Sequence, residues 1–375
     1  MPSLGTDPFP TRAETTWRRP SKSVLSVTDW VAPAWCEYAY LYNTLSASHL
    51  PLEQRPETIT TPEGNTITPN WLELVRKQTT LQRGTDVHAQ IEQELQPIMV
   101  DVRVTTDEDV WALLLVEWAS SVAMISETGR TREVPVCGWV HGTLVRGIID
   151  EIYCNDYGQW VLSETKTRTT RSIPSEDDQI PARWQCMLYL RLWQGMCASF
   201  GCPQNHTDKY TTQLVWDKVW DTLGLQAEQP LSESFLEDLR CIDTPWAWTN
   251  NLTLQQLVTL VTNSVQPLVK RMSSTVEIVY VHRSSAETIG TVHFESQPLH
   301  LQAYLERVRL LWEGQRTWEG VPLQCTHRCS HCAWRDGCEW RDKQAKQVWA
   351  RVMAKKEDEK LWEQFDESDL HMLEW

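Results

Sequence analysis

The stretch Val145–Lys166 reads VRGIIDEIYCNDYGQWVLSETK, and it decides the fold. Its first residues, Val145–Ile149, and the later segment Trp160–Leu162 have the β-branched and aromatic content of buried strands. The NDYG sequence between them, at residues 155–158, is a turn signal. The sequence therefore predicts a β-hairpin.

The hairpin brings three charged side chains together. If the turn is centred near Asp156 and Tyr157, Asp150 falls almost opposite Glu164, where facing side chains lie about 5 Å apart at Cβ. Lys166 projects from the same face as Glu164, because side chains alternate along a strand. Two carboxylates this close repel each other unless a cation lies between them, and a hard divalent ion is the usual one. A surface salt bridge on an amphipathic hairpin is the alternative, since such short patterns recur by accident.

The composition is that of an ordinary soluble globular protein, with 41% hydrophobic and 23% charged residues among 375. A chain of this length forms about two domains or one elaborate domain. No apolar run approaches the roughly 20 residues needed to cross a bilayer, because Glu117 and Ser120 interrupt the best candidate, Val110–Ile125. We therefore expect no membrane association.

The formal net charge of −15 argues against a protein that coats nucleic acid nonspecifically, because such proteins have basic surfaces. Part of the acidic excess lies in the tail, Glu357–Glu374. Next to the hairpin the local charge is positive instead, so a phosphate backbone can dock there. The cations of this region are Lys166, Arg168, Arg171, Arg183 and Arg191.

The chain has 11 cysteines, an odd number that points away from a disulfide scaffold. Four of them crowd into QCTHRCSHCAWRDGCEW at residues 324–340, and the last three have the spacing C-x2-C-x5-C. Such spacing is typical of metal ligands. The four are Cys325, Cys329, Cys332 and Cys338.

Two metal sites are compatible with this segment. The four local cysteines, with His327 and His331 nearby, can bind zinc as a structural knuckle. Alternatively, the C-x2-C-x5-C triplet takes a distant fourth thiolate and holds an iron-sulfur cluster. Cys36 is the candidate for that fourth ligand, although taken alone it fits a buried core thiol better.

The remaining patterns predict a small mixed sheet within a mostly helical frame, that is, a mixed α/β (α+β) fold. Helical patterns cover Thr28–Leu45, Trp71–Leu95, Asp107–Ser126, a helix opened by Pro181 that runs to about Phe200, Leu252–Arg271 and Leu299–Trp312. Strand patterns cover Glu133–Val140, Thr143–Cys154, Gln159–Lys166, Val276–His282 and Thr288–Phe294. A disordered tail is expected at residues 1–25, an irregular Trp-rich insertion at 203–250, and an acidic helix or tail at 346–375.

These pieces resemble a known group of enzymes. Asp150 on one strand, Glu164-Thr165-Lys166 on the next and Gln185-Cys186-Met187-Leu188-Tyr189 on a following helix are similar to the PD-(D/E)xK nucleases of the RecB-like branch. The upstream sequence Arg83-Gly84-Thr85-Asp86-Val87-His88 looks like that branch's glycine-then-histidine motif. One N-terminal cysteine and a C-terminal C-x2-C-x5-C make the chain resemble the exonuclease V family, over about residues 26–340.

The resemblance implies roles for individual residues. It implies a restriction-endonuclease-like core at 26–345, with the chain ends clamped by a 4Fe–4S cluster. Asp150 and Glu164 match the acids that bind Mg²⁺, with His88 close to the metal, and Lys166 matches the catalytic lysine. Gln185 and Tyr189 match the helix that positions the DNA or the lysine, and Arg168 and Arg171 are the expected DNA-positioning cations. The expected cluster ligands are Cys36, Cys329, Cys332 and Cys338, with Cys325 as the alternative fourth ligand.

The resemblance also implies a metal-dependent exonuclease that hydrolyses single-stranded DNA from an end, in DNA repair or genome maintenance. We expect a monomer in the nucleus or mitochondrion, with a single-strand-binding protein as a candidate partner. Two alternatives stay open at this point. One is a non-catalytic DNA-binding or assembly protein built around the metal knuckle, and the other is a structure-specific endonuclease on the same core.

Overall fold

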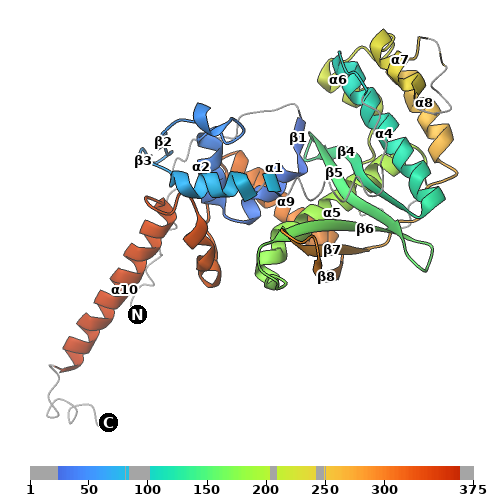
Figure 1. The fold of residues 1–375 in the computed structure, drawn as a ribbon. Coiled ribbons are helices and arrows are strands. Elements are labelled where there is room, and N and C mark those ends of the chain that lie inside the picture. The colour runs from blue at the N-terminus through green and yellow to red at the C-terminus, as the bar shows by residue number, and fades with distance from the viewer. Residues whose placement is uncertain are drawn as a thin grey trace, which may run out of the picture. The chain divides into compact units, whose positions relative to one another are not determined.

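The computed structural model describes residues 24–80, 82–83, 102–202, 209–241, 249 and 251–363, with residues 357–363 described by their backbone alone. These residues form two compact units (Figure 1). One unit contains residues 36–77 and 317–363, and the other contains residues 24–35 and 78–316. Most of the predicted N-terminal tail, residues 1–23, lies outside the described residues.

The second unit is built on a mixed sheet, which confirms the predicted fold class. Its strands occur in the order β1, β5, β6, β7, β8, and β4 pairs with β5 along the edge away from β6. The β1–β5 and β6–β7 pairs are parallel and the other pairs are antiparallel. The strands are β1 (Val24–Ser26), β4 (Arg130–Val140), β5 (Thr143–Cys154), β6 (Trp160–Arg168), β7 (Thr275–His282) and β8 (Thr288–Glu295).

The sheet forks between β5 and β6. Strand β1 pairs with β5 only at Leu144–Arg146, and β6 pairs with it only at Glu151–Cys154. Beyond Ser163, β6 leaves β5 and continues alongside β7 alone. The turn at the closed end is tight, since the Asn155 side chain accepts the N–H groups of Tyr157 (3.0 Å) and Gln159 (2.9 Å). The predicted hairpin is therefore present and open at one end.

Helices pack on this sheet through large apolar side chains. Helix α4 (Asp107–Thr128) starts with a capping box between Thr106 and Asp109 and ends at Gly129, whose φ of 79° suits a residue without Cβ. Helix α5 (Glu176–Ser199) contacts β4, β5, β6 and β7. The unit also contains α1 (Val27–Val31), η1 (Ala32–Ala34), α6 (Trp216–Leu223), α7 (Glu233–Cys241), α8 (Leu254–Val265) and α9 (Pro298–Trp312).

Two predicted helices differ in the structure: one starts earlier, and the other is broken into shorter elements. Helix α5 begins at Glu176, not at Pro181, because the Ser175 hydroxyl accepts the Asp178 N–H and three acidic residues stabilise the first turn. The predicted helix Thr28–Leu45 is broken into α1, η1 and α2 (Glu37–Leu45). Pro33 lies in η1 and Cys36 is extended, with φ −170° and ψ 121°.

The Trp-rich insertion at 203–250 was expected to be irregular, and that expectation is wrong for its described part. Trp216 and Trp220 lie one turn apart on α6 and stack at 5.3 Å, and Trp216 also contacts Phe200 at the end of α5. Trp220 meets Trp111 of α4 at 6.1 Å. Trp216 and Trp220 are therefore core packing residues.

The first unit joins an N-terminal segment, residues 36–77, with a C-terminal segment that begins at residue 317. Its elements are α2, η2 (Leu52–Gln54), β2 (Ile59–Thr60), β3 (Thr66–Ile67), η3 (Leu323–His331) and α10 (Glu339–Glu363), and residues 71–80 are also helical. The buried Glu339 carboxylate accepts hydrogen bonds from the Thr61 hydroxyl and from Asn65 (2.8 Å). Trp334 donates its ring N–H to Asn43 at 3.0 Å. The cysteine-rich segment is thus fastened to α2 and the β2–β3 hairpin.

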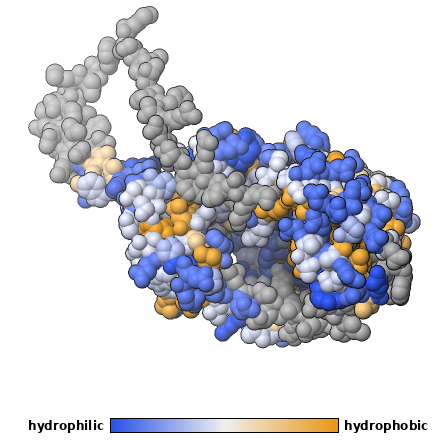
Figure 2. Space-filling model, turned by 90° about the horizontal axis from the view of Figure 1, so that it is seen from above, coloured by the Kyte–Doolittle hydropathy of each residue, from blue (hydrophilic) through white to orange (hydrophobic). Residues whose placement is uncertain are grey.

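The expected lack of membrane association depends on the distribution of apolar residues over the surface and along α4, the long apolar helix. On the face drawn in Figure 2, hydrophilic residues cover most of the surface and the apolar residues form small patches. Helix α4 has the length and composition of a membrane-spanning helix, but 61% of its apolar window is buried inside the structure. Its apolar residues are accounted for by core packing.

We expect Trp118→Ala to lower the free energy of unfolding by about 3–5 kcal/mol, because the fully buried indole leaves a large cavity. Trp118 stacks on Phe200 at 4.7 Å and contacts Trp193 at 5.6 Å. Trp349→Ala is the matched control, since this side chain is 65% exposed and its loss should cost less than about 0.5 kcal/mol. Urea unfolding monitored by circular dichroism measures both; equal midpoints would contradict the packing described.

Candidate active site

Asp150 and Glu164 meet at the fork of the sheet. The β5–β6 register pairs Glu151 with Ser163, so the next residues outward are Asp150 and Glu164, as predicted. The Asp150 carboxylate accepts the backbone N–H of Thr165 at 2.7 Å. In a continued ladder a β5 carbonyl would accept that N–H. The side chain thus replaces a strand bond, which fixes its position.

Lys166 lies on the same face as Glu164. Its Nζ donates to Glu164 Oε1 at 2.7 Å and to Gln185 Oε1 at 2.8 Å. Burial by itself would lower the pKa of Lys166, but the carboxylates of Glu164 and Asp150 outweigh it and hold the pKa above its usual value. The amine is therefore a stable ammonium beside two carboxylates.

Helix α5 completes the site through Gln185 and Tyr189. Gln185 accepts from Lys166 and donates its amide N–H to the Tyr189 hydroxyl at 3.1 Å, so the amide links lysine and phenol. Burial, followed by the charge of Glu164, raises the pKa of Tyr189 and keeps the phenol neutral. All five residues predicted from the hairpin and from α5 are therefore neighbours.

Three contributors were not singled out from the sequence. The Thr165 amide orients Asp150, and Cys186 is fully buried close to the charges of Glu164, Lys166 and Asp150, with burial raising its pKa. Gly147 leaves room for Tyr189, since a Cβ there would lie 2.5 Å from the tyrosine ring. The GIID sequence ahead of Asp150 was the available signal for a close approach of this kind.

The donor set fits a magnesium ion. Asp150 and Glu164 are 8% and 2% exposed, and against the single ammonium of Lys166 the two carboxylates leave one net negative charge. Among the described residues no three His, Cys, Asp or Glu side chains form a ready-made metal cage. Magnesium does not require one, because it usually takes one or two carboxylates and completes its shell with water and substrate phosphate. His88, the third expected ligand, lies outside the described residues.

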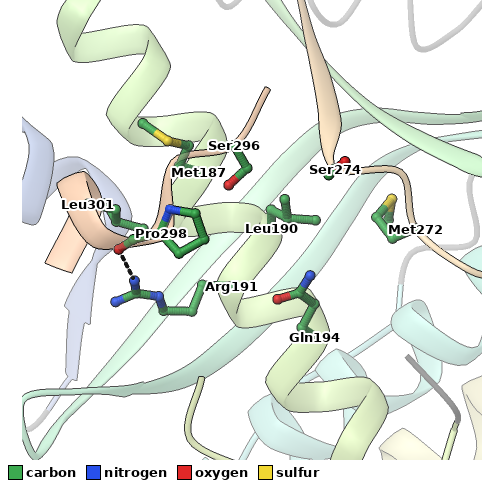
Figure 3. A pocket seen from close by; sticks show the side chains of 9 residues that line it. All are labelled: Met187, Leu190, Arg191, Gln194, Met272, Ser274, Ser296, Pro298 and Leu301. Atoms are coloured by element: carbon green, nitrogen blue, oxygen red, sulfur yellow. Dashed lines mark hydrogen bonds between the residues drawn. The ribbon is translucent and has the colours of Figure 1, made fainter. Parts of the chain in front are cut away.

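Two of the nearby cations have other partners. Arg171 forms an exposed ion pair with Glu287 at 2.8 Å. Arg191 lines a separate pocket of about 70 Å³ between α5 and the start of α9, where it donates to the Pro298 carbonyl at 3.2 Å (Figure 3) and to Gln302 at 2.9 Å. Arg191 is therefore not one of the cations around Lys166, whereas Arg168 lies on the same strand as Lys166.

The first unit gathers the cysteines. The charges of Cys332 and Cys338 both act on Cys36, and Cys329 acts on Cys332 and Cys338. Burial raises the pKa of the Cys36 thiol to about 12. Cys325 is also buried, in η3.

Backbone N–H groups point at these sulfurs, as expected for thiolate ligands. Those of Ala39 and Tyr38 donate to Cys36, and that of Trp334 donates to Cys332. Such bonds lower the thiol pKa and stabilise the anionic form that binds metal. Four thiols are the donor set that an iron-sulfur or zinc site takes, although no three of these cysteines form a ready-made metal cage among the described residues.

Comparison with known proteins agrees with this geometry. A family model described as "Exonuclease V - a 5' deoxyribonuclease" matches residues 70–159 and 155–341. A forked sheet with two acids and a lysine, in a chain that matches this model, defines a deoxyribonuclease. The Exonuclease V of Danio rerio is 29% identical over 324 residues, which are 85% of this chain and 71% of that protein. The chain belongs to the exonuclease V family.

A solved structure, "Crystal structure of SSO0001", covers 85% of this chain and 87% of its own at 11% identity. Its TM-score of 0.36 is too low to support a common fold.

We expect Gly147→Ala to reduce DNA cleavage by about a hundredfold, because the new Cβ would displace Tyr189 and, through Gln185, the lysine. Adding Tyr189→Ala removes the closest clash and leaves only the one with Val27 at 2.8 Å, so the double variant should lose less activity than the two single losses combined. Initial cleavage rates, with thermal melting to confirm folding, measure the effect. Full activity of Gly147→Ala would contradict the close packing.

Proposed function

We propose that this chain is a magnesium-dependent exonuclease that hydrolyses single-stranded DNA, in DNA repair or genome maintenance in the nucleus or mitochondrion. The observation that carries the proposal is the convergence of Asp150, Glu164 and Lys166 at the fork of the sheet. The family match supports deoxyribonuclease activity. A non-catalytic DNA-binding role is disfavoured, because an ordinary salt bridge does not need two buried carboxylates around one lysine.

The chemistry follows from charge. Asp150 and Glu164 would hold Mg²⁺, which when bound supplies charge neutralisation at the phosphate and lowers the pKa of a water. Lys166 donates hydrogen bonds to the attacking water or to a phosphate oxygen, and its positive charge stabilises the anion that develops. Gln185 and Glu164 accept two of the three N–H groups of Lys166, which leaves one N–H to donate to the water or the phosphate. Cleavage therefore needs all three charged residues in one geometry.

Lys166→Ala is expected to abolish cleavage, a loss of at least about a hundredfold, while the protein stays folded and still binds DNA. The reason is that the ammonium contributes to the anionic transition state and the sheet does not depend on it. Lys343→Ala is the control, since this lysine lies in the other unit and pairs with Glu63. Magnesium-dependent release of end label measures the loss; retained activity in Lys166→Ala would refute its role.

A free end separates an exonuclease from the structure-specific endonuclease that remains the second candidate. A linear single strand should be degraded and a closed circular single strand of the same sequence should be resistant. Circles cut at equal rates, with Asp150→Asn inactive on both, would establish an endonuclease on the same residues.

We further propose that Cys36, Cys329, Cys332 and Cys338 hold a 4Fe–4S cluster with a structural role. The electrostatic influence of Cys332 and Cys338 on Cys36 supports Cys36 as a member of this ligand set. A link between residues 36 and 329 closes a loop of nearly the whole chain and removes much unfolded-chain entropy. A monomer acting without a membrane, with a single-strand-binding protein as partner, completes the proposal.

Purified protein should be brown, and Cys36→Ala should lose both iron and thermal stability because the cluster loses a ligand. Cys325→Ala is the matched control and should retain iron. Iron and zinc analysis with visible absorption decides between the sites. A colourless zinc protein that loses its metal in Cys325→Ala but not in Cys36→Ala would overturn the cluster assignment.

A further inference from the structure

Arg183 of α5 is held above β8 by two contacts. Its guanidinium lies 5.1 Å from the centroid of the Phe294 ring and donates to Gln179 at 2.9 Å. Gln179 is 4% exposed and is itself anchored by a bond to the Pro174 carbonyl at 2.9 Å. The side chain is therefore preorganised, and neither contact neutralises its charge.

Arg168 lies two residues beyond Lys166 on β6. It donates to the Thr170 hydroxyl at 3.1 Å, and its Nε–H is buried with no acceptor among the described residues. Neither Arg168 nor Arg183 forms an ion pair with a described carboxylate. Five other arginines of the same unit do bind carboxylates: Arg103, Arg130, Arg132, Arg171 and Arg309.

The two guanidinium groups and Lys166 are all close enough to Tyr280 to act electrostatically on it, although burial affects the pKa of Tyr280 more. The parallel register places Tyr280 beside Lys166 on β7, and the charges of Lys166, Arg168 and Arg183 all act on its hydroxyl. Glu164 and Asp150 balance the charge of Lys166, so Arg168 and Arg183 are the two cations that create an anion site beside it.

We propose that Arg183 and Arg168 bind a second DNA phosphate, adjacent to the one that is cleaved. This inference rests on the proposed function of the neighbouring acids, and it adds a binding site for the phosphodiester next along the strand. Guanidinium groups suit phosphate because their fixed N–H fork matches two phosphate oxygens.

Strand geometry supports the placement. Residues i and i+2 lie about 6.6 Å apart along a strand, so Lys166 and Arg168 offer cations at a spacing similar to that of neighbouring phosphates. Lys166 then acts at the scissile group while Arg168 and Arg183 hold the next one. Holding the neighbouring phosphate aligns the strand for attack, as positioning contacts to the backbone do in general.

Binding is measured with Asp150→Asn protein, which holds DNA without cutting it, and short single-stranded oligonucleotides by fluorescence anisotropy. Arg183→Ala and Arg168→Ala should each weaken binding about tenfold and reduce the salt dependence of log K by about 0.7 per lost contact. Arg183→Lys should recover part of the loss. Arg103→Ala, which removes an exposed arginine paired with Asp238, is the matched control and should bind normally.

A neutral methylphosphonate placed at single positions of the oligonucleotide identifies the phosphate. With Arg183 present, one position should cost about tenfold in affinity, and in Arg183→Ala protein the same substitution should cost nothing further. A penalty that persists in Arg183→Ala, or variants that bind as Arg103→Ala does, would overturn the proposal. If the wild-type chain binds in this pattern but cleaves no DNA, the phosphate site stands and the proposed hydrolysis fails.

Discussion

The hydrogen bond between the Asp150 carboxylate and the Thr165 backbone N–H, at 2.7 Å, is the interaction on which the site depends. A buried amide needs an acceptor, and at the fork β5 no longer supplies one. The Asp150 carboxylate accepts this hydrogen bond instead. The strands can therefore separate without leaving the Thr165 N–H unpaired. Where the strands separate, Glu164 and Lys166 lie next to Gln185 of α5. Strand geometry and site geometry are thus set by one bond.

The core of the site could be predicted from the sequence because its determinants are local. A turn signal at Asn155–Gly158 and the alternation of side chains fix the register, and the register places Asp150 opposite Glu164. The contact of Gln185 with Lys166 is not local, and the family resemblance supplied it. The role of Gly147 could not be predicted, since it depends on how closely the Tyr189 ring approaches.

One helix prediction was wrong because two start signals competed, and one helix was missed. Pro181 is a favoured first residue of a helix, yet Ser175 offers a hydroxyl cap and the acidic first turn a better electrostatic start, so the helix extends backwards through the proline. The insertion at residues 203–250 was predicted to be irregular because the four-residue spacing of two of its tryptophans was not recognised as helical. Trp216 and Trp220 have that spacing, and burial against Phe200 and Trp111 makes the short helix stable.

The net charge does not predict what this chain binds, because some of its arginines are paired with carboxylates and others contact only uncharged groups. Several described arginines of the sheet-containing unit form ion pairs with carboxylates, as in the pairs Arg132–Glu151 (2.7 Å) and Arg309–Glu306 (2.5 Å), and the carboxylate offsets the charge of each guanidinium. Arg168 and Arg183 instead contact hydroxyl, amide and ring groups, which orient a guanidinium without cancelling its charge. Because these two cations lie near Lys166 and the acids, the local charge there favours a phosphate even though the net charge of the chain is −15.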